Sequence, residues 1–371
     1  MTCPRCGNEV PSAAFCVRCG EPLENALSPY PLESRGFAAA PHEHWSLPRI
    51  ISSLFPHLPR ADMAAFRMAL GLGTVVMVVL GLFELFPLAL VVAALLIPLL
   101  TILYLVDVDL YEDQPAPMLA FTIIWGALSG IGIGLASRAI VRDHPNLGVG
   151  DRGDTVLLLG VLLPITGALV ILMGPLILLP YRKFNDVLDG TTFGASCAVT
   201  FVGAEILANS ADFLASGVKA AGSTTPWVLR LLTLGVVVPV LTAAVIGATT
   251  GALWLRWRAP ARDRAALGLA GTPAVAILAA VGVLVGAGLT ELYLSRLLTL
   301  GVLSTAALLA LVALRRVVHL GLLEEAREVE IGPAFTCPNC GRETPRHTFC
   351  GSCGVSLQAL PKAPLRSSSA Q

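Results

Sequence analysis

Charge is scarce in this sequence. Only 13% of the 371 residues are charged, whereas 55% are hydrophobic and the mean hydropathy is +0.76. A soluble protein of this length does not need so much apolar surface. The 25 basic and 25 acidic residues balance, so no global field attracts nucleic acid or acidic lipid. The composition therefore predicts the lipid bilayer, and no nucleic acid, as a partner of the chain.

A cleavable signal peptide is not expected either, because the given sequence opens with a cysteine-rich segment. The first membrane span is therefore expected to act as its own insertion signal. A bilayer core needs about 20 apolar residues per helix. Small residues at helical spacing, such as Gly126, Gly130 and Gly134, or Gly282 and Gly286, favour a packed bundle over a pore. Eight apolar runs predict spans at roughly 65–84, 87–106, 118–138, 155–180, 191–212, 227–255, 269–290 and 296–314.

Basic residues indicate the orientation of these spans. An even number of spans places both termini on one side of the membrane. Arg and Lys residues are more numerous on that side, where Arg315 and Arg316 end the last apolar run. By the positive-inside rule, both termini are predicted to face the cytosol. A solvated helix or linker is expected at 315–332.

Eight of the nine cysteines form two clusters with the same spacing, C-x2-C-x9-C-x2-C. They lie in an internal repeat with the frame CPxCGxExPxxxFCxxCGxxL, at 1–23 (the first cysteine module) and 333–357 (the second cysteine module). A C-x2-C pair directs two sulfurs to one ion, and four thiolates suit tetrahedral zinc. The predicted ligands of two structural Zn²⁺ ions are Cys3, Cys6, Cys16 and Cys19, and Cys337, Cys340, Cys350 and Cys353.

A redox dithiol is the alternative role for these cysteines, whereas four thiolates leave no open position for a catalytic zinc. Phe15 and Phe349 precede the third ligand and are expected in the small core of each module. Modules this short cannot bury enough surface to fold alone, so a metal is expected to supply the folding free energy. They resemble the zinc-ribbon family found at bacterial protein termini. Thiolates persist best in a reducing compartment, in agreement with cytosolic termini.

The predicted fold class is an all-α polytopic membrane bundle of about eight transmembrane helices, flanked by two small β-type zinc ribbons. In the linker, Ile50, Ile51, Leu54 and Phe55 predict either a short helix on the membrane surface or an extended chain. The predicted domains are a zinc ribbon at 1–23, a Pro-rich linker at 24–62, a transmembrane domain at 63–314, a helix or linker at 315–332, a zinc ribbon at 333–357 and a disordered tail at 358–371.

Two segments of the predicted bundle carry further motifs. The first is an acidic, proline-containing loop before a helix, with Asp109, Glu112, Pro115, Pro117, Trp125 and Gly126. The second is a D-G-x-x-F-G helix, with Asp189, Gly190, Phe193, Gly194, Phe201 and Glu205. Together they resemble the PrsW family of intramembrane proteases, over roughly 65–260. The resemblance implies a helical membrane core and, in an active relative, hydrolysis of a peptide bond within the bilayer.

The chain departs from the PrsW pattern at the positions that the resemblance implies are catalytic. The glutamate pair, the lysine and the histidine of that pattern fall on Gly167, Ala168, Ile171 and Pro239. The run 155–180 contains no ionisable side chain. Hydrolysis needs an activated water, from a general base or from a metal held by Glu and His. Glu205 alone is left as a catalytic candidate, with Asn209 and Asp212 as its polar neighbours.

Three functions follow from these observations. The first is a non-catalytic PrsW-like scaffold or regulator, whose cytosolic zinc ribbons bind a cytosolic or membrane protein. The second is an active intramembrane protease, metallo or glutamic, that uses Glu205 with loop residues such as Asp109 and Glu112. The third is a proton-coupled transporter with Glu205 in a proton relay. The ribbons could also pair within or between chains, which leaves a homo-oligomer open, and they lack the basic, aromatic surface typical of nucleic-acid binding.

Overall fold

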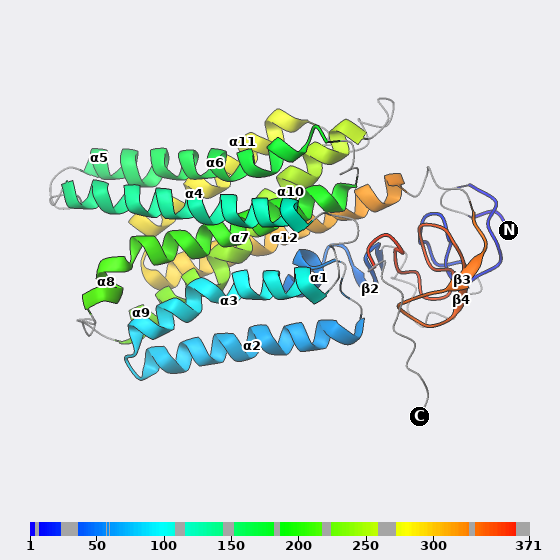
Figure 1. Cartoon of the computed structure of the whole chain (residues 1–371), viewed down its shortest axis with the longest axis horizontal. Helices are drawn as coiled ribbons and strands as arrows, with labels where there is room; N and C mark the ends of the chain where they lie inside the picture. The colour runs from blue at the N-terminus through cyan, green and yellow to red at the C-terminus, as the bar shows by residue number, and fades with distance from the viewer. Residues whose placement is uncertain are drawn as a thin grey trace.

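A computed structural model describes residues 1–3, 7–23, 36–56, 58, 60–107, 116–143, 152–181, 186–216, 224–258, 272–325 and 331–360. Its helices form one elongated bundle, and both cysteine modules lie at the same end of it (Figure 1). The predicted functional residues Cys6, Asp109 and Glu112 lie outside the described residues. So do the linker residues 24–35 and the tail residues 361–371.

Eight helical spans of the described chain are long and apolar enough to cross a membrane, which confirms the predicted number. They indicate a multi-pass membrane protein. The long helices are α2 (Arg60–Leu82), α3 (Phe86–Asp107), α4 (Ala116–Asp143), α6 (Leu163–Leu178), α7 (Val187–Asn209), α10 (Val238–Arg258), α11 (Pro273–Tyr293) and α12 (Arg296–Glu325). Short helices precede or follow them: α5 (Arg152–Thr155), α8 (Ala211–Ser216) and α9 (Thr224–Leu232).

Two of the spans contain a π-helical segment. The segment η1 (Val156–Leu162) leads into α6, and η2 (Thr233–Val237) joins α9 to α10. Each segment lies just before a proline, Pro164 or Pro239. A proline ring inside a helix displaces the carbonyl four residues earlier, and that carbonyl falls within the π segment in both cases. The wider π turn takes up the displacement, so both spans stay continuous.

The helix α7 lies at the centre of the bundle, and it packs most extensively on α4 and α10. A methyl group added at Gly126 or Gly130 of α4 would overlap the backbone of α7, and one at Gly134 would lie 2.8 Å from it. The predicted series of small residues therefore lets these two helices touch. In the described structure, Gly282 and Gly286 of α11 face open space, so that pair supports no helix contact there.

Residues 36–56 and 58 of the predicted linker form a cap on one end of the bundle. Ile51 and Leu54 are buried, and the Phe55 ring lies 4.7 Å from that of Tyr104. The apolar face of the predicted short helix therefore packs into the protein, where α2 and α12 cover it, and does not lie on the membrane surface. The cap consists of the antiparallel strands β1 (Gly36–Phe37) and β2 (Ala40–His44) and the helix α1 (Ile50–Leu54).

The last helix continues beyond the predicted end of its span. The sequence predicts that the span ends at Arg315 and that its side chain contacts water. In the structure, α12 runs on to Glu325 and the Arg315 side chain is 0% exposed. An ion pair with the cap replaces water as its partner, as described below. The second cysteine module then begins with the hairpin of β3 (Ala334–Thr336) and β4 (Glu343–Pro345), and the described chain continues to the buried Ala359 and to Leu360.

Candidate functional site

Four cysteine thiols converge in the second cysteine module. The sulfur atoms of Cys337, Cys340, Cys350 and Cys353 all lie within 4.8 Å of one another, and all four cysteines are free. The Cys337–Cys353 and Cys340–Cys350 sulfur pairs are 3.9 and 3.8 Å apart. A tetrahedral ion with Zn–S bonds of about 2.3 Å separates its sulfurs by about 3.8 Å. The cluster can therefore hold a metal ion of that size without rearrangement.

Three of the four predicted donors of the first cysteine module are likewise together. The sulfurs of Cys3, Cys16 and Cys19 lie within 4.8 Å of one another, and that of Cys3 is 3.7 Å from that of Cys19. Hydrogen bonding with the Cys19 thiol lowers the pKa of Cys16 to about 5. This favours the thiolate, the form that binds metals. The fourth predicted donor, Cys6, lies outside the described residues.

A glycine in the left-handed conformation closes each cysteine pair. Its φ angle is 68° at Gly7, 70° at Gly20, 69° at Gly341 and 70° at Gly354. Each of these amides donates a hydrogen bond of 2.8–3.0 Å to the carbonyl of the cysteine four residues earlier. Residues with a Cβ rarely adopt this conformation. The four predicted glycine knuckles thus have one common geometry, and in the second module the sulfurs of both pairs converge.

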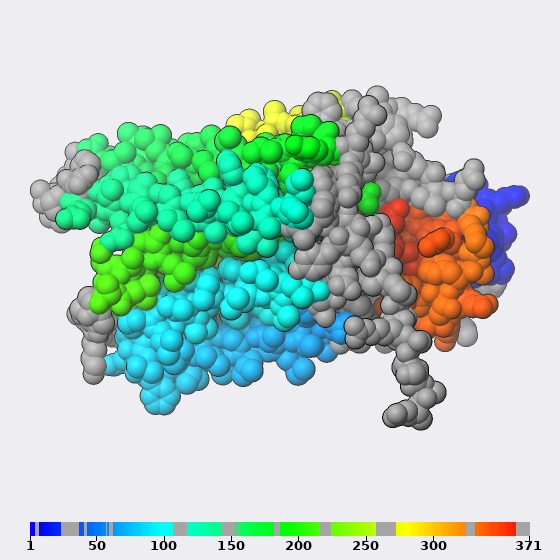
Figure 2. Space-filling model, in the orientation of Figure 1, coloured from blue at the N-terminus to red at the C-terminus, as the bar shows by residue number. Residues whose placement is uncertain are grey.

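The two cysteine modules pack against each other with approximate two-fold symmetry. The Phe15 amide donates to the Gly351 carbonyl at 2.9 Å, and the Phe349 amide donates to the Val17 carbonyl at 2.9 Å. In the repeat, Phe15 corresponds to Phe349 and Val17 to Gly351. The two hydrogen bonds are therefore equivalent, as at the interface of a symmetric dimer. Figure 2 shows the modules side by side, the first in blue and the second in orange and red.

The phenylalanine rings complete this interface. A methyl group added at Gly20 would lie 2.9 Å from the Phe349 ring, and one at Gly354 would lie 2.6 Å from the Phe15 ring. The sequence places each ring in the core of its own module. The structure instead places each ring against a glycine of the other module, and it buries Phe349 completely. Each module thereby supplies the apolar surface that the other is too small to provide. We call the paired modules the head.

The head is attached to the membrane bundle through the cap. The Ser356 amide of the second cysteine module donates to the Ala38 carbonyl at 3.0 Å. The Ala38 amide in turn donates to Nδ1 of His319 on α12 at 3.2 Å. One chain of hydrogen bonds therefore runs from a cysteine module through the β1–β2 turn to α12.

A buried ion pair lies beneath this attachment. Nη2 of Arg315 on α12 is 3.1 Å from Oε2 of Glu43 on β2, and the two side chains are 0% and 5% exposed. Ser52 donates to the same carboxylate at 2.5 Å, and Arg315 lies 4.1 Å from the centre of the Phe37 ring. Burial raises the pKa of Glu43, but the Ser52 hydrogen bond and the charges of Arg315 and Arg49 outweigh burial and lower the pKa overall. Glu43 therefore stays ionised and fixes the cap to α12.

Glu205 faces a second and separate feature, a cavity of about 310 Å³ within the bundle. Asn209 of α7, Arg230 of α9 and Glu291 of α11 also line this cavity. The described residues provide no hydrogen bond to the Glu205 carboxylate. The other predicted neighbour, Asp212, forms an ion pair with Arg138 instead. Glu205 and Asn209 thus line one cavity, together with the carboxylate of Glu291 and the guanidinium of Arg230.

Glu291 is a residue that the sequence reasoning missed. The predicted seventh span ends at 290, one residue too early to include it, whereas α11 continues to Tyr293. An ionisable residue near the end of an apolar run is normally read as a flank in contact with water. Its role becomes visible only when α11 is placed beside η1 and α6, which line the same cavity.

Comparison of the chain with protein-family models, with curated proteins and with solved structures gave no significant match. The fold and the sites therefore define a class only: a helical, multi-pass membrane-type protein with a cysteine cluster at each end that can hold a metal ion. The resemblance to the PrsW family depends on the motif residues alone.

Proposed function

We propose that this chain is a zinc-binding protein of the bacterial cytoplasmic membrane that acts as a non-catalytic scaffold or regulator. One observation carries the proposal: the two cysteine modules form a single head, and hydrogen bonds fasten that head to the membrane bundle. The bundle anchors the head, and metal binding holds the head's surface in shape. A protein partner would bind to this surface.

Zinc is the proposed metal because all described donors are thiols and their separations suit a Zn–S tetrahedron. Iron also binds to four thiolates, so metal analysis of the purified chain is the direct test. About two zinc ions per chain are expected. A stoichiometric content of iron, or no bound metal in a folded head, would contradict this assignment.

The head is proposed to lie in the cytosol. The excess of basic residues on the side of the termini supports this, as does the preference of thiolates for a reducing compartment. Reporter fusions at each terminus test the orientation. A reporter that is active only in the periplasm should stay inactive at both ends, and activity at either end would refute the topology.

We further propose that the bundle belongs to a non-catalytic relative of the PrsW proteases. Gly167 and Ala168, where the resemblance implies two glutamates, line the same cavity as Glu205. These positions on α6 share the cavity with Glu205 on α7, and this supports the resemblance because residues on different helices need not line one cavity. The described lining of the cavity includes no histidine, so one carboxylate is left of the implied catalytic set.

In-cell cross-linking tests the scaffold function. A photoreactive residue is placed at Arg342, an exposed position of the head, and the cross-linked proteins are identified. Glu205→Gln should leave the set of captured proteins unchanged, whereas Cys350→Ser should abolish it by removing a metal ligand. Capture that persists in Cys350→Ser and disappears in Glu205→Gln would contradict the proposal.

The cavity favours an active protease as a second candidate function. Two carboxylates line the one cavity, and such a pair can provide both an acid and a base for hydrolysis. Either Glu205→Gln or Glu291→Gln would then stop the cleavage of a membrane substrate, and the uncut protein would accumulate in cells. A proton-coupled transporter would use the same pair, and it is distinguished by proton flux in proteoliposomes without any cleavage.

A further inference from the structure

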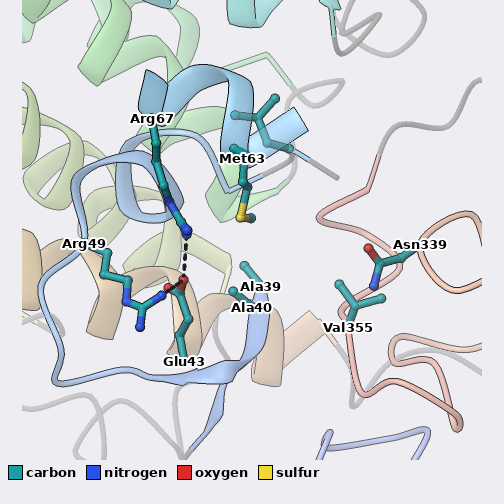
Figure 3. Close-up of a pocket in the computed structure, with 10 residues that line it drawn as sticks. Ala39, Ala40, Glu43, Arg49, Met63, Arg67, Asn339 and Val355 are labelled. Atoms are coloured by element: carbon teal, nitrogen blue, oxygen red, sulfur yellow. Dashed lines mark hydrogen bonds and ion pairs between the residues drawn. The ribbon is translucent and has the colours of Figure 1, made fainter. Parts of the chain in front are cut away.

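A second pocket lies where the head meets the membrane bundle. It has a volume of about 280 Å³, and α2, the cap and the second cysteine module form its walls. In Figure 3, Arg49 and Arg67 point toward Glu43 on one side, and Asn339 and Val355 lie on the other. No function assigned above uses this pocket.

The pocket has an excess of positive charge. Arg315, Arg49 and Arg67 lie 3.1, 2.8 and 3.4 Å from oxygens of the single Glu43 carboxylate. Among the described residues, three guanidinium cations therefore share one anion. Arg315 is buried with Glu43, so the positive charges of Arg49 and Arg67 are only partly balanced within this set.

The two outer arginines are open to a ligand. The Arg49 and Arg67 side chains are 48% and 50% exposed, whereas Glu43 and Arg315 are buried. Both outer guanidinium groups converge on Oε1 of Glu43, so their remaining N–H groups are held close together. Planar guanidinium donors match the oxygens of a phosphate group.

The position of the pocket indicates which phosphate it receives. Arg67 belongs to the candidate span that begins at Asp62, so the pocket lies at the level of lipid headgroups. Trp45 lies on the same cap, and tryptophan is typical of this interface. Beyond Arg67, α2 exposes a row of apolar side chains on which an acyl chain could lie: Met68, Leu72, Val75 and Val79.

We propose that this pocket binds the phosphate group of an anionic phospholipid, between Arg49 and Arg67. The proposal requires the membrane placement of the chain but not its scaffold function. Asn339 links the lipid site to the metal site, since it lines the pocket and its amide donates to the Cys353 sulfur at 3.5 Å. Lipid binding therefore stabilises the attachment of the head, and the metal-bound head completes the lipid site.

Native mass spectrometry of the full chain in neutral detergent tests the proposal. Phosphatidylglycerol, phosphatidylcholine and inorganic phosphate are titrated separately. Phosphatidylglycerol should bind more tightly than phosphatidylcholine, and the double variant R49Q/R67Q should weaken its binding by about tenfold or more. Arg316→Gln is the matched control, because this arginine is exposed and does not line the pocket. The affinity of this variant for phosphatidylglycerol should be unchanged.

A second variant guards against loss of the fold. Ala64→Trp keeps every charge and fills the pocket from the exposed face of α2, so it should also weaken phosphatidylglycerol binding by about tenfold. The proposal is overturned if the two lipids bind equally, if neither pocket variant weakens binding, or if Arg316→Gln weakens it as much. Competition by millimolar inorganic phosphate would also overturn it, because the ligand would then be a soluble phosphate.

Discussion

Pairing of the cysteine modules can be tested with two glycine substitutions that differ only in their surroundings. Gly20 and Gly7 have φ angles of 70° and 68°, and each closes a cysteine pair of the first module. A methyl group at Gly20 would lie 2.9 Å from the buried Phe349 ring, whereas one at Gly7 meets nothing within 4 Å in the described structure. Gly20→Ala therefore perturbs the interface between the modules, and Gly7→Ala serves as its control.

The magnitude follows from two separate costs. Both alanines bear about 1–2 kcal/mol for a left-handed residue with a Cβ. Gly20→Ala alone adds the cost of overpacking against the fully buried Phe349 ring, about 1–3 kcal/mol. The free energy of pairing should therefore differ between the two variants by about 1–3 kcal/mol, or roughly five- to 150-fold in the pairing equilibrium.

Amide hydrogen exchange measures this difference at the interface itself. The Phe349 amide donates to the Val17 carbonyl of the other module, so its exchange reports the opening of the pair. In the metal-loaded full chain, Gly20→Ala should speed the exchange of this amide by roughly five- to 150-fold over Gly7→Ala. Equal exchange in both variants, with equal metal content, would show that the modules do not pair as described.

Three further outcomes are expected. Gly130→Ala should destabilise the detergent-solubilised chain by about 1–3 kcal/mol and lower its unfolding temperature, because the added methyl group would overlap the Phe201 carbonyl. Gly132→Ala is the control: its methyl group meets nothing within 4 Å in the described structure, so the unfolding temperature should stay unchanged. The pKa of Glu43 is lowered from 4.5, so its ion pairs stabilise the fold fully above that pH and are lost as the pH falls through the folded-state pKa. Proteolysis of the head should therefore increase in acid, and Glu43→Gln should show the same sensitivity already at neutral pH. Metal removal by a chelator should abolish the protection of backbone amides from hydrogen exchange in both cysteine modules. Circular dichroism should show that the helical bundle is retained.

Features with a local signal were predictable from the sequence. Eight spans follow from the lengths of the apolar runs, and the metal-binding clusters follow from cysteine spacing. Close helix packing at Gly126 and Gly130 follows from small residues four apart, although the sequence does not identify α7 as the partner. Each of these patterns is contained within one segment of about 20 residues, so no knowledge of the tertiary structure is needed.

Features that join distant segments were not predictable. Glu43 and Arg315 are 272 residues apart, and each looks like an ordinary charged flank in its own segment. The sequence predicts the Phe15 and Phe349 rings in the core of their own modules, whereas each ring packs against a glycine of the other module. The repeated sequence frame does not distinguish a contact within a module from one between modules. Glu291 was missed because its cavity is built from several helices.

The pairing of the modules bears on the topology of the whole chain. An odd number of membrane spans between the modules would place them on opposite faces of the bilayer, about 30 Å of hydrocarbon apart. The reciprocal hydrogen bonds of Phe15 and Phe349 can form only if both modules lie on one face. The paired head therefore requires an even number of spans between the modules. The count of eight, obtained independently from the lengths of the apolar runs, meets this requirement. Gain or loss of an odd number of spans would separate the two modules, so a module at both ends is compatible only with an even-numbered bundle.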